Sequence, residues 1–121
     1  MPRKLRSVLV VDDDDAARNI AVHVLRREPS FRVRAVAHDG LEAIELTGEE
    51  CPDFIVLDHE MPHMTGLEAL PTLRAQCPNA RMVMWSLCPE VEQLVHPAGG
   101  DGFVSKSDPI DRLVAWLKAA G

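Results

Sequence analysis

The sequence has only three cysteines, and their spacing does not indicate a cysteine-based site. Cys51, Cys77 and Cys88 are odd in number and form no C-x-x-C pair, so neither a disulfide framework nor a zinc site is indicated. A proline follows each of them, which disfavours helical backbone and places each cysteine at the boundary of an element. We therefore expect three free, reduced thiols, as in a cytoplasmic protein.

The sequence also lacks long apolar runs and an excess of basic residues. No apolar run approaches the roughly 20 residues that a membrane-spanning helix needs. The basic start Arg3-Lys4-Arg6 is not followed by the apolar core and cleavage site of a signal peptide. The formal net charge of -6 argues against binding to the phosphate backbone of nucleic acids. These absences predict a soluble, cytoplasmic protein that contacts neither membranes nor nucleic acids.

What is present is the composition of one ordinary globular domain. The chain has 121 residues, of which 46% are hydrophobic and 26% are charged, and a chain of this kind can bury a hydrophobic core. It contains no internal repeat, low-complexity tract or linker. We therefore expect residues 1–121 to form a single domain.

Short apolar runs alternate with segments of helical spacing along this chain. The runs that we expect to form strands are residues 7–11, 31–37, 53–57, 81–86 and 102–105. A helical pattern follows each run, and the third of these patterns covers residues 66–76. This alternation is typical of α/β proteins with a doubly wound parallel sheet.

Several acidic residues predict where helices begin. We expect Asp14 or Asp15 to cap the first helix, where a carboxylate accepts free backbone N–H groups. Asp39 and Glu42 have the spacing of a capping box before the second helix. Asp108 is expected to cap the last helix, because proline follows it at the first helical position.

Polar side chains stand at the ends of four of the predicted strands. Asp12 and Asp13 follow the first strand, Asp58 follows the third, Ser86 ends the fourth and Lys106 follows the fifth. The carboxyl ends of parallel strands meet at one edge of a sheet, where such proteins bind ligands. Taken singly, each residue has an ordinary structural explanation as a helix cap, a surface lysine or a strand-end hydroxyl. Their joint occurrence at four strand ends favours a site.

This set of side chains predicts acceptance of a phosphoryl group on a carboxylate. Three carboxylates in one cleft repel one another, and Mg²⁺ relieves that repulsion because it prefers oxygen ligands and also binds phosphate oxygens. Asp58 would be the nucleophile. Lys106 and Ser86 would offer a positive charge and a hydroxyl donor to the phosphoryl oxygens.

The segments around these side chains carry a family resemblance. They are residues 8–13 (VLVVDD), 52–58 (PDFIVLD), 61–66 (MPHMTG), Ser86 and residues 102–106 (GFVSK). Together they resemble the response-regulator receiver domain, the phosphoacceptor module of two-component signalling. The resemblance implies a flavodoxin-like (βα)5 fold with strand order 2-1-3-4-5.

The resemblance also implies a function and a switch. A histidine kinase or a histidine phosphotransfer protein would phosphorylate Asp58, and Mg²⁺ would be held by Asp12, Asp13, Asp58 and the backbone carbonyl of Glu60. Ser86 would then move toward the phosphoryl group and Phe103 would turn inward. The face built from the fourth helix, the fifth strand and the fifth helix would change partners, which are a second copy of the chain or an output protein.

Two features depart from the family pattern and keep other functions open. Leu87 is bulky where the family has a small residue, which could restrict access to Asp58. The predicted fourth helix, residues 90–95, is poor because Pro97 and a Gly-Gly pair follow it, so a loop could replace it. Both features would suit a pseudo-receiver that is never phosphorylated. A phosphatase is disfavoured, because Glu60 stands where a second acid-base aspartate is needed, so we expect a signalling module and not a turnover enzyme.

Overall fold

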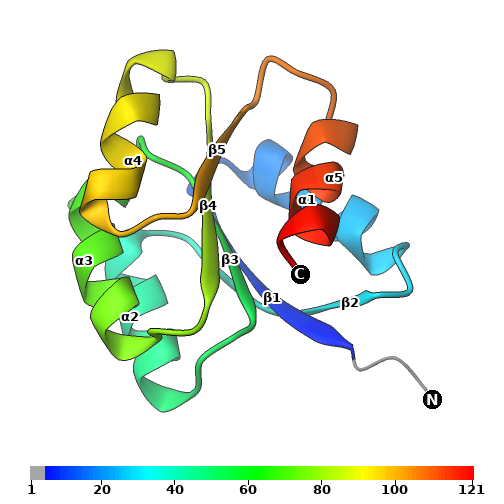
Figure 1. The fold of residues 1–121 in the computed structure, drawn as a ribbon, viewed down its shortest axis with the longest axis horizontal. Coiled ribbons are helices and arrows are strands. Elements are labelled where there is room, and N and C mark those ends of the chain that lie inside the picture. Colours follow the sequence, from blue (N-terminus) through cyan, green and yellow to red (C-terminus); the bar gives the residue numbers. More distant parts are fainter. Residues whose placement is uncertain (1–4) are drawn as a thin grey trace.

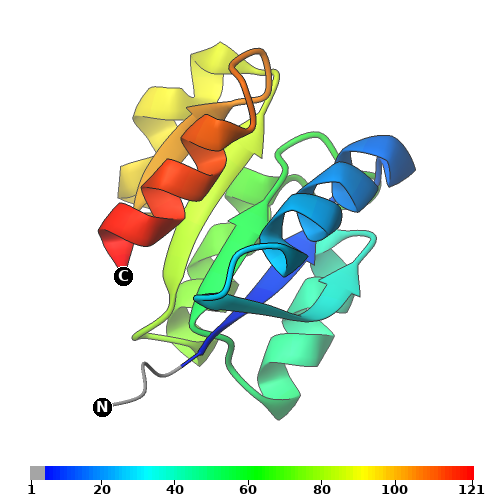
Figure 2. The same cartoon turned by 90° about the vertical axis from the view of Figure 1, so that its right-hand side faces the viewer.

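The computed structural model describes residues 5–121, and residues 1–4, with Arg3 and Lys4 of the basic start, lie outside the described residues. Five parallel strands form one sheet in the order β2-β1-β3-β4-β5, with α2, α3 and α4 on one face and α1 and α5 on the other (Figures 1 and 2). The predicted α/β fold and strand order are therefore confirmed. The strands are β1 (Arg6–Val11), β2 (Phe31–Ala37), β3 (Phe54–Leu57), β4 (Arg81–Ser86) and β5 (Gly102–Ser105).

The helices form where apolar side chains recur on one face. They are α1 (Asp15–Arg26), α2 (Gly40–Glu49), α3 (Gly66–Gln76), α4 (Glu92–Ala98) and α5 (Asp111–Ala120), and a short 3-10 helix, η1 (Pro89–Val91), precedes α4. Within residues 5–121, no helix combines the length and the apolar character that crossing a membrane requires.

The sheet separates two hydrophobic cores. Under α2, α3 and α4, the core contains Leu57, Leu70, Leu73, Met82 and Met84. Under α1 and α5, it contains Val10, Leu25, Trp85, Leu113 and Leu117. All four residues of β3 are buried, as expected of a central strand that is covered on both faces. This double burial holds the strand ends in fixed positions.

The predicted helix starts are confirmed for α1 and partly for α2. The Asp14 carboxylate is the N-cap of α1. Asp39 caps α2 by accepting the N–H of Glu42 at 2.8 Å. The Glu42 carboxylate accepts the N–H of His38 and not that of Asp39, so only one half of the expected capping box forms.

The prediction for the fourth helix was wrong in its extent and in its strength. A loop does not replace the helix, because η1 and α4 together continue from Pro89 to Ala98 with Pro97 in the last turn. Val91 and Val95 are buried against the core, and this burial offsets the hydrogen bond that proline removes. Gly99 then ends the helix with a left-handed φ of 113°, which glycine adopts without strain.

The predicted cap of the last helix was also wrong. Asp108 lies in the turn after β5, where its backbone N–H donates to the Ser105 carbonyl at 3.1 Å. The helix α5 begins only at Asp111, with Ile110 as N-cap and no side-chain cap. The chain thus reverses direction after β5 before the helix can start. Asp108, which the sequence pattern predicts as the helix cap, is part of this turn.

The expectation of three free thiols was wrong for two of them. Cys51, in the loop before β3, and Cys77, the C-cap of α3, form a disulfide with a Cα–Cα distance of 5.6 Å, while Cys88 is free. The two cysteines are 26 residues apart. They meet because α3 runs back along the sheet and ends beside the loop that enters β3, so the fold brings them together and no local spacing reveals the pair.

Candidate functional site

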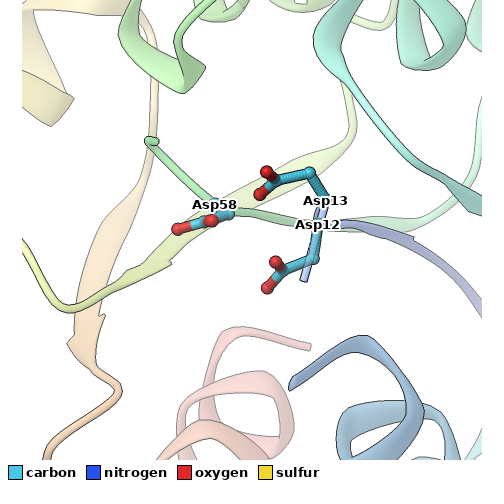
Figure 3. Close-up of side chains that lie close together, drawn as sticks. All are labelled: Asp12, Asp13 and Asp58. Atoms are coloured by element: carbon cyan, nitrogen blue, oxygen red, sulfur yellow. The ribbon is translucent and has the colours of Figure 1, made fainter. Parts of the chain in front are cut away.

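The predicted site residues meet at one edge of the sheet. Asp12 and Asp13 follow β1, Asp58 follows β3, and Lys106 follows β5. The strands β1, β3, β4 and β5 are consecutive neighbours in the sheet, so these ends lie side by side. Figure 3 shows the carboxylates of Asp12, Asp13 and Asp58 gathered together, and one oxygen of each lies within 4.8 Å of the others.

Lys106 joins this group as its positive charge. The Lys106 ammonium lies 2.7 Å from Oδ2 of Asp12 and 3.4 Å from Oδ1 of Asp58. The side chains are 11% exposed for Lys106, 1% for Asp12 and 7% for Asp58. Ion pairs that are shielded from water are much less weakened by solvent than surface pairs. Lys106 therefore balances part of the negative charge at the sheet edge.

Asp12 is held in place by contacts from the start of α1. Its Oδ1 accepts the N–H of Asp14 at 3.0 Å, and its backbone carbonyl accepts a hydrogen bond from Arg18 at 2.9 Å. The Arg18 guanidinium is buried and also pairs with Asp15 at 2.5 Å. Sequence reasoning missed Arg18, and the only available signal is its spacing from Ala21 and Leu25, which places it on the buried face of the helix.

Asp58 is held by the loop between β3 and α3. Its Oδ1 accepts the N–H of His59 at 2.8 Å, and the N–H of Gly66 donates to the His59 carbonyl at 2.8 Å. A Cβ atom at Gly66 would lie 2.2 Å from the Asp58 carbonyl oxygen, so only glycine fits. Thr65 and Glu68 then start α3 with a full capping box, a feature that sequence reasoning missed.

The environment raises the pKa of Asp58 from 3.8 to about 6. Burial contributes most, because it disfavours the charged carboxylate, and the neighbouring Asp12 raises the pKa further. Lys106 and the N–H of His59 lower it in part. Asp58 is thus ionised at neutral pH but destabilised as an anion, so a cation or a new bond at its oxygen is favourable.

The three carboxylates fit a hard divalent cation. Asp12 and Asp58 are buried while Asp13 is exposed, so one side of the group faces the protein and the other faces solvent. Mg²⁺ prefers such a set, since it takes a few carboxylates and keeps several waters. The side chain of Glu60, two residues after Asp58, is exposed, and the role of its backbone carbonyl as a metal ligand stays a prediction.

The residues expected to relay a signal lie close to the site in sequence and fold. Ser86 is buried; its hydroxyl accepts the N–H of Cys88 at 3.1 Å and its carbonyl accepts the N–H of Lys106 at 2.9 Å. Phe103 is half-buried and packs against the core under α4. Leu87, next to Ser86, is 63% exposed, so it packs into neither core, and its effect on access to Asp58 stays a prediction.

The arrangement can position a carboxylate nucleophile and neutralise charge that builds up beside it. Asp58 presents an ionised oxygen at the sheet edge. The Lys106 ammonium lies close enough to Asp58 to contact an anionic group that binds there. Preorganised charges of this kind stabilise the transfer of phosphoryl groups, whose charge is spread over several oxygens.

Comparisons with known proteins identify one shared family. A sequence model of the response regulator receiver domain matches residues 8–118. Chemotaxis protein CheY of Listeria monocytogenes serovar 1/2a is 34% identical over 115 residues, which are 93% of this chain and 96% of that protein. The crystal structure of the CheX–CheY–BeF3–Mg complex from Borrelia burgdorferi matches with a TM-score of 0.86 at 27% identity, over 95% of this chain and 88% of the other.

Other relatives are longer than this chain. Protein-glutamate methylesterase/protein-glutamine glutaminase 5 of Geobacter metallireducens is 41% identical over 119 residues, which are 94% of this chain and 33% of that protein. Several curated relatives are covered over only 23–48% of their length. The similarity therefore concerns a segment that these relatives share with this chain.

Proposed function

This chain belongs to the response regulator receiver family, and on that basis we propose that it accepts a phosphoryl group on Asp58 in a Mg²⁺-dependent reaction. The donor would be a phosphorylated histidine of a histidine kinase or of a histidine phosphotransfer protein. One observation carries the proposal. Lys106 lies between Asp12 and Asp58, at 2.7 and 3.4 Å, beside a third carboxylate.

In the proposed reaction, an oxygen of Asp58 attacks the phosphorus atom. The new O–P bond forms as the N–P bond of phosphohistidine breaks, and the histidine nitrogen leaves with the bonding electron pair. Lys106 would shift from the carboxylates to a phosphoryl oxygen, and the Ser86 hydroxyl would donate to another. Mg²⁺, held by Asp12, Asp13, Asp58 and the carbonyl of Glu60, would offset negative charge on the phosphoryl oxygens.

The readout of phosphorylation is proposed to lie on the face of α4, β5 and α5. Movement of Ser86 toward the phosphoryl group would leave room for Phe103 to turn inward, and these changes would favour one of two conformations. The partners are then a second copy of this chain or an output protein. We place this signalling module in the cytoplasm, where histidine kinases present their phosphorylated residues, and we assign it no nucleic-acid or membrane partner.

The alternative, a pseudo-receiver that acts without phosphorylation, is not favoured. It drew support from Leu87 and from an expected break in the fourth helix, but α4 is formed from Glu92 to Ala98. The acidic residues and the lysine are also all present at the sheet edge. The proposal remains that of a signalling module without turnover of its own, and the activities named for the longer relatives are not carried over to this chain.

The proposal is tested by incubating the protein with a small acyl phosphate and Mg²⁺ and measuring its intact mass. We expect one phosphoryl group per chain, lost with a metal chelator and in Asp58→Asn. Asp108→Asn, a change at an exposed carboxylate outside the site, should leave the adduct intact. Failure of every donor, including a phosphorylated histidine kinase, would favour the pseudo-receiver. Continued release of phosphate from general phosphate esters would point to an enzyme instead.

A further inference from the structure

Trp85 lies beside Lys106 and has no role in the proposed reaction. The Lys106 ammonium lies over the Trp85 ring, 5.1 Å from its centroid. A cation within about 6 Å of an indole face is attracted by the ring's electrons, and tryptophan is the strongest such partner among side chains. Trp85 directly precedes Ser86 at the end of β4, and its side chain packs in the core on the α1 and α5 face of the sheet.

The Lys106 ammonium has three neighbouring groups among residues 5–121. Two are the carboxylates of Asp12 and Asp58, and the third is the Trp85 ring, whose residue is only 6% exposed. The ring therefore keeps water from one side of the ammonium. Charge that is shielded from water acts more strongly on its neighbours, and the ring also limits where the ammonium can move.

Packing alone does not account for a tryptophan at position 85. Its indole Nε1 is buried and has no hydrogen-bond partner among the described residues, and a buried donor without a partner lowers stability. Leucine or phenylalanine, although smaller, would place no polar atom in the core under α1 and α5. What indole adds, and leucine does not, is an aromatic face for the Lys106 charge.

We propose that Trp85 is a positioning residue whose ring face keeps the Lys106 ammonium beside Asp58 at the sheet edge, both in the resting site and while the ammonium contacts the phosphoryl group. The expected effect on phosphorylation rests on the proposed function. The contact between Trp85 and Lys106 can be measured without any phosphoryl transfer. Trp85 acts through Lys106 and touches no reacting atom.

The first test is a double-mutant cycle on the rate of phosphoryl acceptance from a small acyl phosphate. We expect Trp85→Leu to slow acceptance about 3- to 30-fold, the range that a cation–π contact supplies, and Trp85→Phe to slow it less. In a Lys106→Met background, Trp85→Leu should have no further effect, because the partner is gone. Equal slowing in both backgrounds would mean that Trp85 serves only packing, and would overturn the inference. Trp85→Phe repeats the cycle if the leucine variant does not fold.

The second test uses fluorescence and no phosphoryl donor. In a Trp116→Phe protein, Trp85 is the only tryptophan, and Lys106→Met should shift its emission because a charge leaves the ring face. Lys118→Met is the matched control, since Lys118 pairs with Glu28 and should leave the spectrum unchanged. An unchanged spectrum in Lys106→Met would contradict the contact. If the shift occurs but the wild-type protein accepts no phosphoryl group, the positioning contact stands and the proposed function fails.

Discussion

At the scale of single residues, Asp58 is a buried anion, and its ionised form lowers the stability of the folded protein. Its side chain is 7% exposed and has Asp12 as a neighbour, and Lys106 offsets only part of the resulting cost. Such unfavourable charge is typical of functional sites, where a ligand later relieves it. The residue is therefore better suited to reacting and to binding a cation than to stabilising the protein.

This view predicts that Asp58→Asn stabilises the protein at pH 7 when divalent cations are chelated. The folded-state pKa of Asp58 is about 6, above the ordinary value of 3.8. Below pH 3.8 the carboxyl group is neutral in both the folded and the unfolded protein, so the penalty, which is the loss of folding free energy caused by the buried Asp58 anion, is absent. The penalty grows as the pH rises between these values and is complete above pH 6, where it reaches about 2–3 kcal/mol.

Urea unfolding at two pH values measures this penalty. At pH 7 the free energy of unfolding of Asp58→Asn should exceed that of the wild type by about 2–3 kcal/mol, and near pH 4 the difference should largely vanish. Asp108→Asn, at an exposed carboxylate, should change little at either pH. A variant that is less stable than the wild type at pH 7 would show that Asp58 is paired favourably and not strained.

At the scale of elements, the loop between β3 and α3 depends on one glycine. Gly66→Ala would place a methyl group 2.2 Å from the Asp58 carbonyl oxygen, so the loop must move. We expect a loss of about 1–3 kcal/mol in the free energy of unfolding, together with weaker Mg²⁺ binding, because the same loop fixes Asp58.

Gly48→Ala is the matched control for that substitution. Gly48 lies within α2, and its nearest neighbour would be 3.5 Å from the added Cβ, which is an ordinary contact. Alanine at such a position should stabilise the protein by about 0.4–1 kcal/mol. Equal effects of the two substitutions in thermal or urea unfolding would mean that Gly66 is not packed against Asp58.

The disulfide between Cys51 and Cys77 ties the end of α3 to the loop before β3. Closing a loop of 26 residues should stabilise the oxidised protein by about 3–4 kcal/mol in the chain-entropy model. In the cytoplasmic location proposed above, thiols stay reduced, so the cross-link is expected in the isolated, oxidised protein and not in the cell. Denaturant unfolding with and without a dithiol reductant measures its contribution.

Two substitutions separate the cross-link from general effects of the reductant. Cys51→Ser should lower the free energy of unfolding of the oxidised protein and remove its response to the reductant. Cys88→Ser, which changes the free cysteine, should leave that response intact. An oxidised wild-type protein that unfolds at the same denaturant concentration as its reduced form would contradict the stabilising role of the bond.

At the scale of the whole molecule, the sequence predicts the sheet and the site because both depend on local patterns. The apolar runs that end at Val11, Leu57 and Ser86 are buried strands, and polar side chains at their ends must meet once the strands are parallel. Asp12, Asp13, Asp58 and Lys106 could therefore be placed together before the structure was known.

The features that sequence reasoning missed depend on contacts between distant segments. The pairing of Cys51 with Cys77 needs the path of α3, and α4 forms through Pro97 because the core buries Val95. Asp108 looked like a helix cap because its neighbours match that pattern, but the reversal after β5 uses it in a turn. The contact of Trp85 with Lys106 likewise joins β4 to the residue that follows β5, and it has no local signal.

The central claim, that Asp58 itself is the phosphoacceptor, is tested most directly by trapping the acyl phosphate. Borohydride reduces an aspartyl phosphate to the alcohol homoserine, which peptide mass spectrometry locates in the chain. After incubation with an acyl phosphate and Mg²⁺, we predict homoserine at position 58 and at no other position. Homoserine at Asp12 or Asp13, or a phosphoryl adduct that yields none, would contradict the account.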